Sequence, residues 1–183
     1  MAEFMNDSYF SEILCKIFII FEAEIDLFYQ GDNSYIRNNK EQFAGSINYR
    51  LFNIIYEIDF NNFYKVLKNY DIFKRSDGLN MSKYYLGLLE VRYPNGTINY
   101  DTIYNNVNFS LKLIDAIRNY KFDVKYLDFI ISSMKKNRIY CGDILFDSDN
   151  YQMFEYLVSK ISNSSDDYNS FINQYKKVLS NRI

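Results

Sequence analysis

The stretch from Ser8 to Tyr29 constrains the fold most, because it is the most apolar run in the chain. Its apolar residues recur at intervals of three and four, the spacing of one wide face of an α-helix. They are Phe10, Ile13, Leu14, Ile17, Phe18, Phe21, Ile25 and Phe28. Asp7 or Ser8 can cap the first turn, and Gly31 follows where helices often end in a left-handed conformation. The stretch predicts a core helix on which the other helices pack.

Shorter segments with the same periodicity follow along the chain. We expect further helices at about 40–58, 60–70, 81–91, 101–120, 124–140, 150–161 and 168–180. Asp59, Asp101 and Asp123 are the expected caps of three of them. The expected buried face of the helix at 101–120 consists of Ile103, Val107, Leu111, Ile114 and Ile117. The predicted fold class is therefore all-α, a compact bundle of about seven or eight helices.

The segment 90–100 allows a second interpretation, because it holds the only proline of the chain and the pair Asn95-Gly96. An Asn-Gly pair between apolar residues is typical of a β-hairpin turn. Residues 90–93 would then pair with residues 97–100 in one short hairpin. The other interpretation is a tight turn between helices, and the sequence leaves both open.

The chain of 183 residues is short enough for a single helical domain, which we place at 5–183. Residues 1–4 read as a vector remnant, since Glu3-Phe4 is what an EcoRI cloning site encodes. Two cysteines far apart in sequence fit a reducing compartment. Neither a signal peptide nor a membrane-spanning segment is recognisable. We therefore predict a cytoplasmic protein, in the host cytoplasm if it is viral, with no membrane partner.

The residue types that most enzymes rely on are scarce. The chain has no histidine and only six glycines. Histidine is the commonest general base and metal ligand, and glycine-rich loops hold nucleotide phosphates. We therefore predict that the chain is not an enzyme and has no catalytic, cofactor-binding or metal-binding residues.

Three groups of charged residues could form sites. Glu22 and Asp26 share a helix face and could hold a divalent cation or act as an acid/base pair, but the favoured interpretation is a solvated helix face. Asp143, Asp147 and Asp149 lack the glycine and the glutamate of a calcium loop. The run 135–138 (KKNR) is best explained as cations at a helix C-terminus. With a net charge of −2, we predict no binding of nucleic acid.

Tyrosine is the remaining unusual feature, with 19 residues in the chain. Tyrosine is enriched at protein interfaces, although an A/T-rich genome would also raise its number. The expected exposed candidates are Tyr29, Tyr35, Tyr49, Tyr56, Tyr104 and Tyr151. We therefore predict a protein-binding antagonist or modulator, in its leading version a viral or phage inhibitor of a host pathway.

Three alternatives stay open beside this prediction, and the partner protein is unidentified in all of them. The first is a bacterial immunity protein whose acidic face neutralises a toxin. The second is an enzyme that uses carboxylates with a metal ion. The third is a self-assembling structural protein, in which a tyrosine-rich surface closes a homodimer.

Overall fold

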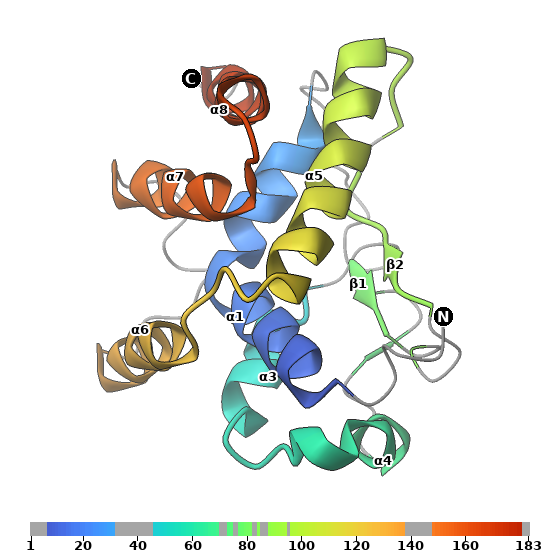
Figure 1. Cartoon of the computed structure of the whole chain (residues 1–183), viewed down its shortest axis with the longest axis vertical. Coiled ribbons are helices and arrows are strands. Elements are labelled where there is room, and N and C mark those ends of the chain that lie inside the picture. The colour runs from blue at the N-terminus through green and yellow to red at the C-terminus, as the bar shows by residue number, and fades with distance from the viewer. Residues whose placement is uncertain are drawn as a thin grey trace. The chain divides into compact units, whose positions relative to one another are not determined.

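The chain is all-α with one short β-hairpin in the part that its computed structural model describes (Figure 1). The described residues are 7–31, 46–69, 73–74, 77–81, 84, 88–94, 96–137 and 148–180. They belong to two compact units. Unit 1 comprises Met1–Glu22, Asn39–Arg92 and Asp123–Cys141, and unit 2 comprises Ala23–Asn38, Tyr93–Phe122 and Gly142–Ile183. The fold class predicted from periodicity is confirmed, and the single domain at 5–183 stays a prediction.

Helix α1 (Ser8–Gln30) contributes residues to both units. Its first turn is capped by Asp7, whose Oδ1 accepts a hydrogen bond of 3.0 Å from the backbone N–H of Phe10. The helix ends at Gly31, which has a φ of +56°, and a Cβ at that position would overlap the side chain of Thr102. Both predicted ends are confirmed. No helix in the described ranges is long and apolar enough to cross a membrane.

The burial of α1 exceeds what one apolar face would give. All eight predicted apolar side chains are buried, and so are the charged side chains of Lys16, Glu22 and Glu24. Lys16 is bonded to Glu12 at 2.5 Å and to Asp128 at 2.7 Å, so its ammonium group has two carboxylate partners. A charged side chain buried on such a helix is stable when it is paired inside the protein, or it loses its charge.

Unit 1 also contains α3 (Asn48–Ile54), the 3₁₀ turn η2 (Phe60–Asn62), α4 (Phe63–Asn69) and α6 (Val124–Asn137). The predicted cap Asp59 accepts a hydrogen bond of 3.1 Å from the N–H of Asn61. The predicted cap Asp123 accepts one of 2.9 Å from the N–H of Lys125. Both caps are confirmed. Of the helix predicted at 40–58, residues 40–45 lie outside the described part.

The β-hairpin joins β1 (Leu79–Asn80) and β2 (Glu90–Val91), with Leu79 opposite Val91 and Asn80 opposite Glu90. The helix predicted at 81–91 is therefore wrong at residues 90–91. Of the predicted strand at 90–93, residues 90–91 form β2, but the predicted pairing with 97–100 is also wrong. Asn99 caps α5, since its side chain accepts a hydrogen bond of 3.0 Å from the N–H of Thr102. The residues after Gly96 therefore start a helix instead of a strand.

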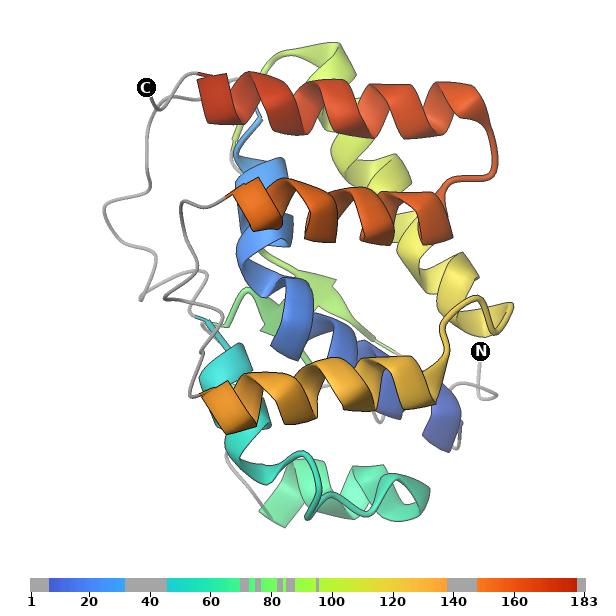
Figure 2. The same ribbon diagram turned by 90° about the vertical axis from the view of Figure 1, so that its left-hand side faces the viewer.

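Unit 2 contains α5 (Tyr100–Arg118), α7 (Ser148–Ile161) and α8 (Ser165–Ser180). Figure 2 shows α7 and α8 antiparallel and side by side, with α5 crossing behind both. Aromatic rings fill the space between these helices and the end of α1. Phe28 stacks on Phe109 at 4.5 Å between ring centroids, and Phe154 stacks on Tyr175 at 4.0 Å. Each such pair contributes about 0.5–1.5 kcal/mol beyond its buried area.

The rotation of α5 about its axis differs from the prediction. Its cap is Asn99 instead of Asp101. Its predicted buried residues Ile103, Val107 and Leu111 are 45%, 56% and 61% exposed. The buried face consists instead of Thr102, Asn105, Asn106, Phe109, Leu113, Ala116 and Ile117. The physical reason is that Phe109 joins the aromatic cluster and the two asparagines bond to α8, which turns the aliphatic side of α5 to solvent.

Candidate docking surface

Five large side chains on α5 form a continuous exposed row, which we call the α5 stripe. It consists of Tyr100, Ile103, Tyr104, Val107 and Leu111. The spacing of three and four residues places them on one face of the helix. Tyr100 and Tyr104 are 75% and 54% exposed, and their rings stack at 6.2 Å between centroids. An apolar row of this kind on one helix resembles the seam along which helices pair.

A network of buried amides on the opposite face fixes this orientation of α5. Gln174 of α8 donates hydrogen bonds from Nε2 to the carbonyl oxygen of Phe28 at 3.0 Å and to Oδ1 of Asn106 at 2.9 Å. Its Oε1 accepts one of 3.1 Å from Nδ2 of Asn105. The Oδ1 of Asn105 accepts a further hydrogen bond from the hydroxyl of Ser170 at 2.7 Å. Turning α5 to bury the stripe would break these bonds, at about 1–3 kcal/mol for each buried group left unpaired.

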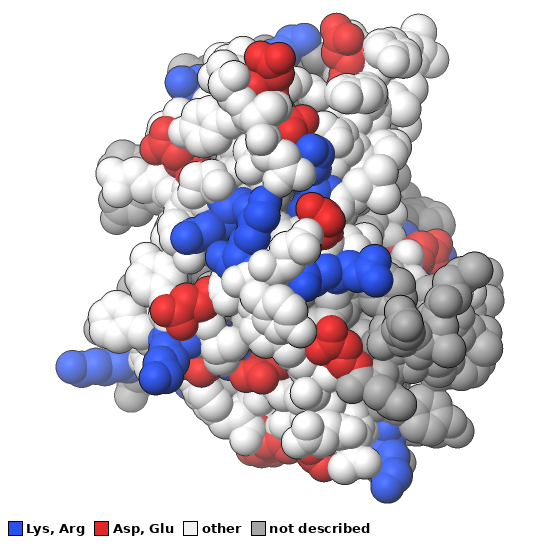
Figure 3. Space-filling view, in the orientation of Figure 1, with Lys and Arg blue, Asp and Glu red and all other residues white. Residues whose placement is uncertain are grey.

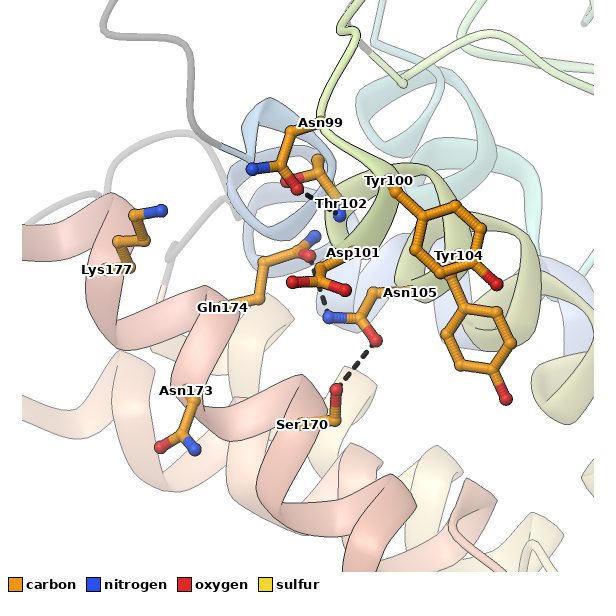
Figure 4. Close-up of a pocket in the computed structure, with 10 residues that line it drawn as sticks. All are labelled: Asn99, Tyr100, Asp101, Thr102, Tyr104, Asn105, Ser170, Asn173, Gln174 and Lys177. Atoms are coloured by element: carbon orange, nitrogen blue, oxygen red, sulfur yellow. Dashed lines mark hydrogen bonds between the residues drawn. The ribbon is translucent and has the colours of Figure 1, made fainter.

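A pocket of about 500 Å³ adjoins the N-terminal end of the stripe, between α5 and α8 (Figure 4). Tyr100 and Tyr104 stand on one side of it, and Lys177 lies across from them. The residues that line it are Asn99, Tyr100, Asp101, Thr102, Tyr104, Asn105, Ser170, Asn173, Gln174 and Lys177. The hydroxyl of Ser170 bonds to an amide and not to a base. The lining therefore offers polar contacts to a bound group.

One edge of the stripe is acidic. Asp101, Asn108 and Asp115 recur every seven residues along α5, so they lie on the same side of the helix. We call this row the acidic edge, and both of its carboxylates are exposed. Asn108 donates a hydrogen bond of 3.0 Å to Asp167 at the start of α8. On the face shown in Figure 3, Lys and Arg side chains gather near the middle, and Asp and Glu lie around them.

Asp167 belongs to this side of unit 2 but is neutralised locally. Lys112 forms an ion pair of 3.0 Å with its Oδ2. Burial opposes ionisation of Asp167, yet the hydrogen bonds from Lys112 and Asn108 outweigh it, so the pKa of this carboxyl is lowered. The carboxylates of the edge that face solvent are therefore Asp101 and Asp115.

The tyrosines predicted to be exposed differ in their surroundings. Tyr49, Tyr56 and Tyr104 are exposed as expected, whereas Tyr151 is half-buried. The predicted exposure of Tyr29 is wrong, because it is 2% exposed and its hydroxyl shares a hydrogen bond of 2.6 Å with Ser110. Burial raises the pKa of the Tyr29 hydroxyl. Tyr35 lies outside the described residues. Among the six, Tyr104 alone lies on the α5 stripe.

The predicted solvated face at Glu22 and Asp26 is wrong for Glu22, which is buried. Its carboxylate accepts hydrogen bonds from the hydroxyl of Ser46 at 2.6 Å and from the N–H groups of Ile47 at 2.9 Å and Asn48 at 2.8 Å. Glu22 thus caps the first turn of α3 from another helix, where a negative charge complements the helix dipole. The residue has a structural role that its spacing in the sequence did not indicate.

The other charged groups give no site within the described ranges. No group of three or more His, Cys, Asp or Glu residues that could hold a metal ion is found there. Asp143 and Asp147 lie outside these ranges, as does the side chain of Asp149. Lys135 and Lys136 occupy the last turn of α6, as predicted. The ammonium of Lys135 lies 4.5 Å from the ring centroid of Tyr56.

Periodicity assigned Ile103, Val107 and Leu111 of the α5 stripe to the core, whereas Tyr104 was predicted to be exposed. Asn105, Asn106 and Phe109 form a second face of the same helix, and the sequence alone does not show which of the two faces is buried. Comparison with known proteins adds nothing to this site, because no family model, curated protein or solved structure matches the chain.

Proposed function

We propose that this chain is a protein-binding protein that docks another protein through the α5 stripe. A single observation carries the proposal: α5 exposes its aliphatic and aromatic side while it buries amides against α8. Exposing several large apolar side chains in a continuous row is unfavourable unless something covers them. The satisfied amide network holds the row outward.

The size of the stripe supports docking. A Tyr side chain offers about 150–250 Å², so the exposed fractions of Tyr100 and Tyr104 leave roughly 200–300 Å² of aromatic surface. Ile103, Val107 and Leu111 extend this surface along the helix. A stable interface buries about 800 Å² on each partner, with an apolar centre and a polar rim. The stripe would supply the centre, and the pocket and the acidic edge would supply part of the rim.

The residue types of the stripe also fit binding. Tyrosine side chains at the centre of an interface often carry much of the binding energy. A straight apolar row on a helix is the surface that a partner helix or groove recognises. The narrower version of the proposal is a cytoplasmic antagonist that blocks a host pathway by stoichiometric binding. The high number of tyrosines is typical of proteins from A/T-rich genomes, and this association supports a viral or phage source.

The test is capture of a partner from the cells in which the protein is made, using the tagged full chain and two variants. Val107→Gln/Leu111→Gln removes the middle of the stripe. Phe129→Gln is the matched control, since Phe129 on α6 is a large exposed apolar residue outside the stripe. All three chains are checked for folding by circular dichroism.

We expect one protein in stoichiometric amount with the wild type and with Phe129→Gln, and its loss with the double variant. The captured protein is then purified and titrated against the same chains, and the double variant should weaken binding at least about tenfold, since each buried aliphatic side chain contributes about 1.5–3 kcal/mol. Equal capture by the double variant would refute the proposal.

A further inference from the structure

We propose that the α5 stripe receives an amphipathic helix of another protein that carries Lys or Arg along one edge of its apolar face. The inference rests on the proposed function and specifies the chemistry of the partner. It follows from the charge at the border of the stripe and from the geometry of helix pairing.

The acidic edge sets the charge that a partner must carry. Asp101 and Asp115 flank the stripe on the same side and stand two helical heptads apart. A helix lying along the stripe places its own flanking residues against this edge, as the flanking positions of paired helices do. Like charges there would repel and opposite charges would attract. The partner edge that faces Asp101 and Asp115 is therefore basic.

The exposed tyrosines add a second preference for a cation. The rings of Tyr100 and Tyr104 stack at one end of the stripe, and Asp101 lies on the same turn. A guanidinium over a tyrosine face gains a cation–π interaction, and an arginine at this end of the partner could also reach the Asp101 carboxylate. This arrangement favours arginine over lysine at that position.

A second copy of this chain is the obvious competing occupant, and the charges argue against it. In an antiparallel pair related by a two-fold axis near Asn108, each helix presents the same edge to its partner. Asp101 of one copy would then lie opposite Asp115 of the other, which places like charges together. In a parallel pair the acidic edge would face the opposite edge, which consists of Ile103, Ser110 and Ile114 and carries no charge. Neither arrangement pairs the carboxylates.

The test uses two synthetic amphipathic helices of equal length as probes, with identical apolar faces and either Lys and Arg or Glu along the edges. Binding of each fluorescent peptide to the full chain is measured by anisotropy at low and at high salt. We expect the basic peptide to bind about five- to tenfold more tightly than the acidic one at low salt, because exposed ion pairs each contribute a modest factor to affinity. The preference should shrink at high salt, where exposed charges are screened.

Variants of the two aspartates test whether the preference for the basic peptide arises from α5. Asp101→Asn and Asp115→Asn should each reduce the preference for the basic peptide by about twofold. The matched control is Glu57→Gln, which removes one exposed negative charge outside α5 and should leave the preference unchanged. Val107→Gln/Leu111→Gln should abolish binding of both peptides. An equal reduction by Glu57→Gln would mean that net charge alone attracts the peptide, and would overturn the inference.

The remaining outcomes separate this inference from the proposed function. If both peptides bind the stripe equally well, the inference that the partner helix has a basic edge is wrong, whereas the proposal that partners dock on the stripe still holds. The oligomeric state of the full chain is measured by sedimentation. If the wild type is a dimer and Val107→Gln/Leu111→Gln is a monomer, the occupant of the stripe is a second copy of the chain, and the inference is wrong. If neither peptide binds and the double variant still captures the cellular partner, both the inference and the proposed function are wrong.

Discussion

Glu24 gives the sharpest prediction, because its carboxyl group is buried in α1 with only 4% of the residue exposed. Its Oε2 has no hydrogen-bond partner in the described part of the chain. Burial raises the pKa of Glu24 from 4.5 to about 7, and a hydrogen bond to its own backbone only partly offsets this. The folded protein therefore holds a proton at Glu24 at pH values where the unfolded chain has lost it.

The sign and the size of the effect on stability follow from this difference. Between pH 4.5 and pH 7 the folded state binds more protons than the unfolded state, so the free energy of unfolding falls as the pH rises. The stabilisation is fully present below pH 4.5 and is lost as the pH passes through about 7. A difference of 2.5 pKa units (7 minus 4.5) corresponds to about 3 kcal/mol.

The assay is urea unfolding of the wild type and of Glu24→Gln between pH 4.5 and pH 8. Glutamine cannot titrate, so the variant should lack the loss of about 3 kcal/mol that the wild type shows. The range from pH 4.5 to pH 8 suits this measurement because the chain has no histidine, whose side chain would otherwise titrate in the same range. Glu57→Gln, an exposed control, should keep the wild-type dependence on pH. A Glu24→Gln curve parallel to that of the wild type would refute the reasoning.

Three further predictions concern stability and are checked by urea unfolding at pH 7. Glu22→Gln should lower the free energy of unfolding by about 2–4 kcal/mol, because one of the donors at the start of α3 loses its carboxylate acceptor; an unchanged midpoint would exclude the cap. Gln174→Ala should lower it by about 2–5 kcal/mol, since buried amides of α5 lose their partner, whereas Asn173→Ala on the exposed side of α8 should have little effect. Gly31→Ala should lower it by more than about 1 kcal/mol, because the left-handed backbone and the contact with Thr102 both oppose a Cβ; a neutral result would contradict this account of the end of α1.

The parts of the fold that were predictable depend on residues close together in sequence. The cap at Asp7, the stop at Gly31 and the caps at Asp59 and Asp123 each involve contacts within a few residues. Helix periodicity also depends on short intervals, so the existence of most helices could be read directly from the chain.

The parts that were not predictable depend on distant residues. The rotation of α5 is decided by Gln174, which lies 69 residues beyond Asn105. The role of Glu22 is decided by Ile47 and Asn48, which follow it by 25 and 26 residues. A pattern of apolar residues cannot show which of two helix faces finds a buried partner. Periodicity therefore places Ile103, Val107 and Leu111 in the core, and only the packing of α8 shows that they join Tyr104 on an exposed row.

Both functional proposals depend on the orientation of α5, and thiol labelling measures this orientation directly. Single cysteines are placed on the two faces of the same helix by Val107→Cys and Ala116→Cys, in a chain whose Cys141 is replaced by serine. Cys15 and Ala116 are both fully buried, whereas Val107 is more than half exposed. With a maleimide reagent under native conditions, the account predicts rapid labelling at position 107 and labelling at position 116 only upon unfolding. Protection at 107 with rapid labelling at 116 would place the stripe in the core and contradict the account.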